Sequence, residues 1–394
     1  MKNWRKSARF LWLCNFIIVA AMTMILPFLP LYLEELGVTG SKALSNWTGA
    51  VFSAAFLSGA IMAPIWGIFA DKYGQKANLI RAGIGMGILT FSMSFATGPW
   101  MLLALRFFMG FFSGFITVSF SYLSRITPKE HTGSALGFLQ TGGISGGIIG
   151  PLFGGALSDW FGFRPVFAVT GVSILMTLML VIFFIPKDEP MKAVKGKPGT
   201  FLDVLRNKQL LILFIATFLL QAAMLSTNSM MTIFVKTFVH NPENLALLAG
   251  LAASILGIAT IIGSPYLGKL GDRIGHIKML PVVMLLSGLL FFPQLWTDNI
   301  YELYIWRFLQ GLILGGVWPA IQTLIHKKTP EDIQGRAFGV TASCRFLGNL
   351  TGPIIGGWIS GSFMTAYVFG FAGVILVMGS VLVKWGVERG VERD

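Results

Sequence analysis

Residues 67–76 read GIFADKYGQK, and residues 268–277 read GKLGDRIGHI. The two stretches share three residues at a constant offset of 201: Gly67, Asp71 and Gly74 correspond to Gly268, Asp272 and Gly275. A glycine permits the tight turn that a short polar loop needs, and a carboxylate near a helix N-terminus is electrostatically favourable. The ordered match predicts an internal duplication with the same loop in each half.

Further pairs at offsets of 201 or 202 extend the duplication along both halves. They are Arg106, Gly110 and Gly114 with Arg307, Gly311 and Gly315; Pro128, Gly133 and Gly137 with Pro330, Gly335 and Gly339; and Gly150, Pro151, Gly154 and Gly155 with Gly352, Pro353, Gly356 and Gly357. We therefore predict an N-terminal six-helix bundle over 1–186, a cytoplasmic linker over 187–208 and a C-terminal six-helix bundle over 209–394. Two halves of like orientation are related by an axis along the membrane normal.

The composition indicates a chain that is solvated by lipid. Of the 394 residues 54% are hydrophobic and 12% charged, whereas soluble domains carry about 25% charged residues. A helix needs about 20 apolar residues to cross a bilayer, and continuous apolar runs favour helices over a barrel. Twelve stretches meet this need: 10–32, 46–70, 77–97, 99–122, 134–158, 164–186, 209–236, 245–270, 277–297, 300–324, 335–360 and 364–386. These predict an all-α polytopic membrane protein, with Cys14 and Cys344 inside helices rather than in a disulfide.

The placement of the charges predicts the orientation. The net charge is +13, and most of the 30 Lys and Arg fall on the side that holds both termini and the linker. On the opposite side we place only Lys42, Arg164 and Lys236. The positive-inside rule then puts both termini in the cytoplasm. A nucleic-acid-binding patch is the disfavoured alternative.

Two further stretches carry a family resemblance. Residues 102–114 read LLALRFFMGFFSG, and residues 142–155 read GGISGGIIGPLFGG. With the loop at 67–76, they resemble the fourth-helix motif, the fifth-helix antiporter motif and the signature loop of the major facilitator superfamily. Over nearly the whole chain, the sequence is similar to twelve-helix multidrug exporters of the drug/proton antiporter family. The resemblance implies the major facilitator fold, with two six-helix bundles related by pseudo-two-fold symmetry. It also implies export of amphiphilic drugs from the bacterial cytoplasm by proton antiport with alternating access.

The resemblance also implies roles for individual residues. We expect those that act in proton coupling or conformational change to be Arg106, Glu34, Asp71, Gly74, Asp272, Gly150 and Pro151. Arg106 either perturbs a proton-binding group or snorkels to the interface, since an ionised side chain in lipid is costly. Glu34 is the first candidate for that proton-binding group, because no acid lies deep within a predicted helix. Arg307 is interpreted as structural, paired with Glu302.

Polar residues within apolar helices are the candidates for substrate contact. Arg345 lies deep in its helix without an acid nearby, so its partner is either a carboxylate on another helix or an anionic substrate. The further candidates are Asn15, Gln140, Gln221, Asn228, Trp318, Gln322 and Asn349. Each is also explained by helix packing alone.

Two other functions remain open. One is dedicated export of an endogenous anionic metabolite such as a carboxylate siderophore, and the other is a proton-independent lipid flippase or a transporter-like sensor. An enzyme is disfavoured, because no P-loop, HExxH or GxSxG motif occurs and the four histidines lack metal-ligand spacing. We expect no cofactor and no metal, a proton gradient as the energy source, and a monomer whose partners are a small-molecule substrate, protons and lipid but no nucleic acid.

Overall fold

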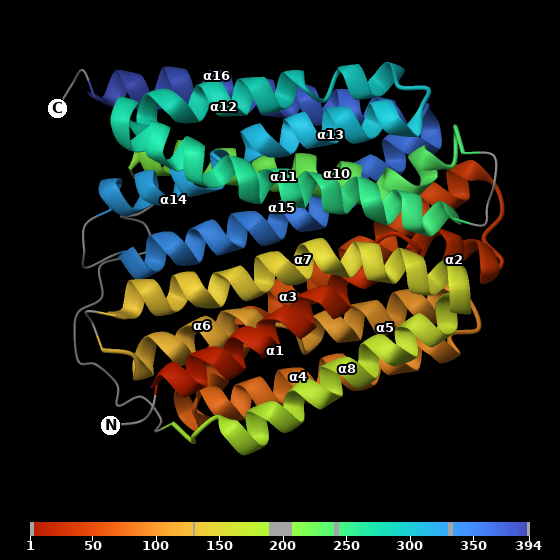
Figure 1. Ribbon diagram of the computed structural model, residues 1–394, viewed down its shortest axis with the longest axis horizontal. Helices are drawn as coiled ribbons and strands as arrows, with labels where there is room; N and C mark the ends of the chain where they lie inside the picture. The colour runs from red at the N-terminus through yellow and green to blue at the C-terminus, as the bar shows by residue number, and fades with distance from the viewer. Residues whose placement is uncertain (1–3, 129–130, 189–206, 240–243, 330–333, 392–394) are drawn as a thin grey trace. The chain divides into compact units, whose positions relative to one another are not determined.

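The computed structural model describes residues 4–128, 131–188, 207–239, 244–329 and 334–391 (Figure 1). Over these ranges the chain is helical and contains no strand. Each of the twelve predicted stretches coincides with one helix or with two helices in succession. Nine helical spans within the described ranges are long and apolar enough to cross a membrane. Two further long helices, α7 and α15, are rich in glycine.

The described residues form two compact units. Unit 1 comprises Met1–Thr39, Ala54–Val194 and Asn241–Ser254. Unit 2 comprises Gly40–Ser53, Lys195–His240 and Ile255–Asp394. The predicted linker 187–208 lies outside the described residues except at its two ends. Two helices are divided between the units. The first part of α3 (Ser41–Tyr73) belongs to unit 2 and the first part of α11 (Leu245–Ile274) to unit 1.

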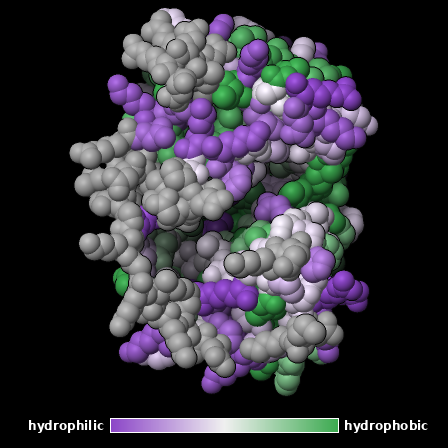
Figure 2. All heavy atoms as spheres, turned by 90° about the vertical axis from the view of Figure 1, so that its left-hand side faces the viewer, coloured by the Kyte–Doolittle hydropathy of each residue, from purple (hydrophilic) through white to green (hydrophobic). Residues whose placement is uncertain are grey.

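The remaining elements of unit 1 are α1 (Trp4–Met24), α2 (Leu29–Glu35), α4 (Gln75–Ser92), η1 (Met93–Phe95), α5 (Pro99–Phe111), α6 (Phe115–Ile126), α7 (Thr132–Phe161) and α8 (Phe163–Phe184). Those of unit 2 are α10 (Lys208–Val235), α12 (His276–Leu289), η4 (Pro293–Trp296), α13 (Ile300–Leu314), α14 (Val317–Lys328), α15 (Gln334–Ser362) and α16 (Tyr367–Val391). On the face that Figure 2 shows, hydrophilic side chains are prominent among the coloured atoms, and hydrophobic ones lie mainly toward the flanks.

The predicted duplication is confirmed by corresponding neighbours in the two units. In unit 1, α1 packs along α7 and α8, and α4 packs along α8. In unit 2, α10 packs along α15 and α16, and α12 packs along α16. The loop glycines correspond as well, because Gly74 and Gly275 both have φ of +90°, a region that favours glycine.

Candidate functional site

The glycine-rich helix α7 packs closely on α1. Four of its glycines recur at every fourth residue: Gly142, Gly146, Gly150 and Gly154. A Cβ atom on any of them would lie within 3.0 Å of a backbone oxygen of α1. The predicted smooth face for close helix contact is therefore present.

A second face of α7 contacts the first part of α11, and both segments belong to unit 1. A Cβ atom on Gly250 would clash with the Pro151 carbonyl oxygen, and one on Gly155 would clash with the Ala246 carbonyl oxygen. Nearby, Ser254 Oγ donates a hydrogen bond of 2.6 Å to the Ile148 carbonyl. The antiporter-like motif thus holds a segment that comes from the other half of the sequence.

The corresponding contact in unit 2 joins α15 to the first part of α3. A Cβ atom on Gly357 would lie 2.5 Å from the Ser45 carbonyl oxygen, and one on Gly49 would clash with the Pro353 carbonyl oxygen. Ser53 Oγ donates to the Leu350 carbonyl at 2.7 Å. The second copy of the motif therefore makes the same kind of contact as the first.

Asp159, at the end of α7, caps the N-terminus of α11. Its Oδ2 accepts a hydrogen bond of 2.9 Å from the Leu247 backbone N–H. Burial raises the pKa of this carboxyl, although the hydrogen bonds from Leu247 and Ala246 act in the opposite direction. Asp159 was not predictable from the sequence, because a lone acid at a helix end carries no sign of the partner that it meets.

The first signature loop is capped by a residue from outside the motif. Asp188, which follows α8, accepts hydrogen bonds from the backbone N–H groups of Gln75 at 2.7 Å and Lys76 at 2.9 Å. It therefore supplies the carboxylate at the N-terminus of α4. The side chain of Asp71 lies outside the described residues. In the second loop, Asp272 lies 3.2 Å from the His276 Nε2 atom.

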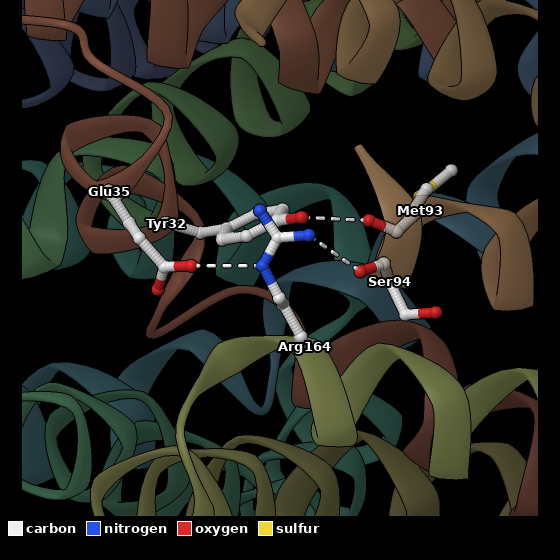
Figure 3. A network of polar contacts seen from close by, with 5 residues as sticks. All are labelled: Tyr32, Glu35, Met93, Ser94 and Arg164. Atoms are coloured by element: carbon white, nitrogen blue, oxygen red, sulfur yellow. Dashed lines mark hydrogen bonds and ion pairs between the residues drawn. The ribbon is translucent and has the colours of Figure 1, made fainter. Parts of the chain in front are cut away.

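The acidic end of α2 is held by a polar network (Figure 3). The Arg164 guanidinium pairs with Glu35 at 3.1 Å and donates to the Ser94 carbonyl at the same distance. The buried Tyr32 hydroxyl donates to the Met93 carbonyl at 2.9 Å. The network joins α2, η1 and α8, and the neighbouring Glu34 is half-buried at this end of unit 1.

Two predicted interior arginines are buried in corresponding helices. Arg106 on α5 is 5% exposed, and Arg307 on α13 is 0% exposed. The expected pairing of Arg307 with Glu302 is wrong for the described contacts, since Glu302 is exposed and Arg307 instead contacts Asn228 at 3.5 Å. Glu302 and Arg307 lie five residues apart on α13 and face different directions around the helix axis. Their spacing in the sequence alone did not show this difference.

Arg345 differs from its predicted environment. Its side chain is exposed rather than buried, and its guanidinium carbon lies 4.7 Å from the centroid of the Trp318 ring, within the range of a cation–π interaction. The structure describes no ion pair for it. Unit 2 therefore brings together two of the predicted substrate contacts, Arg345 and Trp318.

The other predicted polar residues are divided between the units. Asn15 and Gln140 belong to unit 1, whereas Gln221, Asn228, Gln322 and Asn349 belong to unit 2. Asn15 is fully buried and Gln140 is exposed. Within the described ranges, both amide atoms of Asn15 and the side-chain oxygens of Gln322 and Asn349 have no hydrogen-bond partner. These groups retain the capacity to bind a polar ligand.

Comparisons with known proteins agree with this architecture. The chain is 37% identical to the Multidrug resistance protein MdtG of Rahnella sp. (strain Y9602) over 390 residues, which are 98% of this chain and 95% of the relative. It is 40% identical to that of Salmonella paratyphi B over 392 residues, which are 98% and 96% of the two chains.

Solved structures show the same fold. A bacterial homolog of the human lysosomal transporter Spinster, in an inward-facing and occupied conformation, matches with a TM-score of 0.81 at 16% identity over 98% of each chain. The nucleoside transporter NupG matches with a TM-score of 0.74 at 16% identity over 96% of this chain and 97% of that one. The Major Facilitator Superfamily model matches residues 11–247 and 244–393. The chain therefore belongs to the Major Facilitator Superfamily and is a multi-pass membrane transporter.

Proposed function

We propose that the chain exports amphiphilic drugs or related small molecules from the cytoplasm by proton antiport. The observation that carries the proposal is the full-length identity of 37% and 40% to two proteins named Multidrug resistance protein MdtG. This level of identity covers nearly the whole length of both chains. Both termini would lie in the cytoplasm, as the distribution of Lys and Arg predicts.

Alternating access would operate through the two glycine contacts. In unit 1 the α7–α11 contact holds the first part of α11, and in unit 2 the α3–α15 contact holds the first part of α3. Each held segment continues into a helix whose remainder belongs to the other unit. A rocking motion of one half against the other must therefore break both contacts, and their equivalence supports a cycle in which they open together.

We assign substrate contact to Arg345 and Trp318, with Asn15, Gln140, Gln221, Asn228, Gln322 and Asn349 as further polar contacts. A guanidinium beside an indole face suits an amphiphile that has an aromatic body and an anionic group. A purely cationic drug is disfavoured, because like charges at close range repel each other.

Proton coupling would involve Arg106, Glu34, Asp71, Gly74 and Asp272, with Gly150 and Pro151 in the moving contact. A proton gradient would be the energy source, without a cofactor. The burial of the Arg106 guanidinium supports this assignment, since an ionisable side chain inside the membrane is costly and marks a functional position.

The second candidate is a dedicated exporter of an endogenous anionic metabolite. It is favoured by the exposed Arg345, for which no described carboxylate forms an ion pair. A susceptibility panel on deletion and overexpression strains separates the two candidates. Drug sensitivity that changes with gene dosage supports multidrug export, whereas loss of a secreted anion without any drug shift contradicts it.

Proteoliposomes with an imposed pH gradient test the coupling. We expect drug flux to collapse when the gradient is dissipated. Flux that continues unchanged would reject antiport and favour a proton-independent flippase.

A further inference from the structure

The buried guanidinium of Arg307 in unit 2 has only neutral described neighbours. Its Nη1 donates to Asn228 Oδ1 at 3.5 Å, and its Nη2 lies 3.7 Å from the Met231 sulfur. Its central carbon lies 5.7 Å from the centroid of the Phe369 ring. Its Nε has no hydrogen-bond partner among the described residues. An amide, a thioether and an aromatic face thus surround a full positive charge.

These contacts are weak for a charge in this position. Charge-assisted hydrogen bonds to oxygen span about 2.7–2.9 Å, and a thioether is a poor acceptor. A buried cation that lacks a counter-charge costs several kcal/mol, which an incoming anion can recover. The site therefore favours an anion electrostatically, and the described contacts of Arg307 do not supply one.

The exposure of the neighbours indicates the direction of access. Arg307 and Met231 are buried, whereas Asn228 is half-buried and forms the longest polar contact of the cluster. An entering carboxylate that displaced the Asn228 amide from Nη1 and the Met231 thioether from Nη2 would accept hydrogen bonds from both nitrogens, in the end-on bidentate geometry that guanidinium groups favour. Met231 and Phe369 would then contact the apolar part of the same molecule.

We propose that Arg307, with Asn228 at its entrance, binds the carboxylate of an amphiphilic aromatic anion. The site deepens the proposed export function and is distinct from Arg345, whose exposed guanidinium already stacks on an indole. Binding at Arg307 does not require transport, so it is measured separately from export.

The test is equilibrium binding to the purified full-length chain in lipid nanodiscs, with 2-naphthoate and the neutral isostere 2-naphthamide as probes. We expect naphthoate to bind at least about tenfold more tightly than the amide, since a charge-assisted pair adds about 1.4 kcal/mol or more. The Arg307→Gln variant should remove this preference, and Arg307→Lys should retain part of it.

A matched control is Arg81→Gln. Arg81 also lies beside an aromatic ring and an asparagine, but both of its hydrogen bonds to Asn78 Oδ1 are short, at 2.9 Å and 2.7 Å. The preference for naphthoate should survive in this variant. Equal affinities of the two probes for the unmodified chain would overturn the proposal, and so would a preference that persists in a folded Arg307→Gln variant. If Arg307→Gln does not fold, the affinities of the two probes for the unmodified and the Arg307→Lys chains are compared. A preference for naphthoate that is undiminished in Arg307→Lys would then overturn the proposal. Naphthoate binding without drug export would reject the export function and leave this site standing.

Discussion

The contact between α15 and the first part of α3 can be opened by a single methyl group. In the Gly357→Ala variant the new Cβ would lie 2.5 Å from the Ser45 carbonyl oxygen, against about 3.4 Å for ordinary van der Waals contact. The two backbones must therefore separate by about 1 Å. Overpacking of this kind costs about 1–3 kcal/mol, which shifts an equilibrium between closed and open contact by about 5- to 150-fold.

The control is Gly339→Ala in the same helix, where an added Cβ meets nothing within 4 Å. Both variants gain the same helix propensity from alanine, so their difference isolates the clash. The reporter is Ser45→Cys in a chain without Cys14 and Cys344, because Ser45 is fully buried in the closed contact.

The assay is the rate at which a membrane-impermeant maleimide labels this cysteine on intact cells. We expect labelling to rise about 5-fold or more in Gly357→Ala and to stay unchanged in Gly339→Ala. A second reporter, Ser254→Cys at the α7–α11 contact, should respond in the same direction if the two contacts open together. Equal labelling rates in Gly357→Ala and Gly339→Ala would refute the reasoning. The clash with the Ser45 carbonyl would then not open the contact between α15 and α3.

Three further predictions concern polar contacts. Asp188→Ala should lower the thermal midpoint of the purified chain, because loss of a helix N-cap costs about 1 kcal/mol, and Asp188→Asn should retain part of that stability. The raised pKa of Asp159 means that the closed α7–α11 contact binds a proton more tightly than the open one, so its stability is greatest at low pH and falls as the pH rises through the raised value. Because every thiol reacts faster with maleimide as the pH rises, labelling of Ser254→Cys is compared at each pH with the same reporter in the Asp159→Asn variant. The ratio of the two rates should rise with pH, and a ratio that does not change with pH would contradict the assignment. In differential scanning fluorimetry, Glu35→Gln should shift the midpoint little, because exposed ion pairs contribute under about 1 kcal/mol. Tyr32→Phe should shift it more, because it removes a buried hydrogen bond to the Met93 carbonyl and leaves only the Ala96 N–H, among the described residues, as a donor to that oxygen.

Local pattern was enough to predict the helices and the duplication. A membrane-spanning helix satisfies its own backbone hydrogen bonds, so a sufficiently long apolar run specifies its structure without reference to other segments. The loop glycines were predictable for a similar reason, because the φ of +90° at Gly74 and Gly275 is a local requirement of the turn. Recurrence of the same residues at an offset of 201 then identified the repeat.

The environments of the interior charges were not predictable in this way. Arg307 was expected to pair with Glu302 and contacts Asn228 on another helix instead, and Arg345 was expected to be buried and stacks on Trp318. The direction of a side chain around its helix axis and the identity of the helix opposite both depend on packing between segments distant in sequence.

The sequence by itself therefore determined that the chain is a duplicated bundle of helices: the apolar runs specified the helices, and the loop 67–76 with its copy specified the duplication. Only the tertiary structure decided that both copies of the glycine–proline motif hold a segment from the other half, at Gly250 in one unit and at Gly49 in the other. Glycine spacing specifies that a helix has a smooth face, because that is a property of one helix. It does not specify which helix lies against the face, because that choice is made by the complementary surfaces and by the free energy of packing the whole chain.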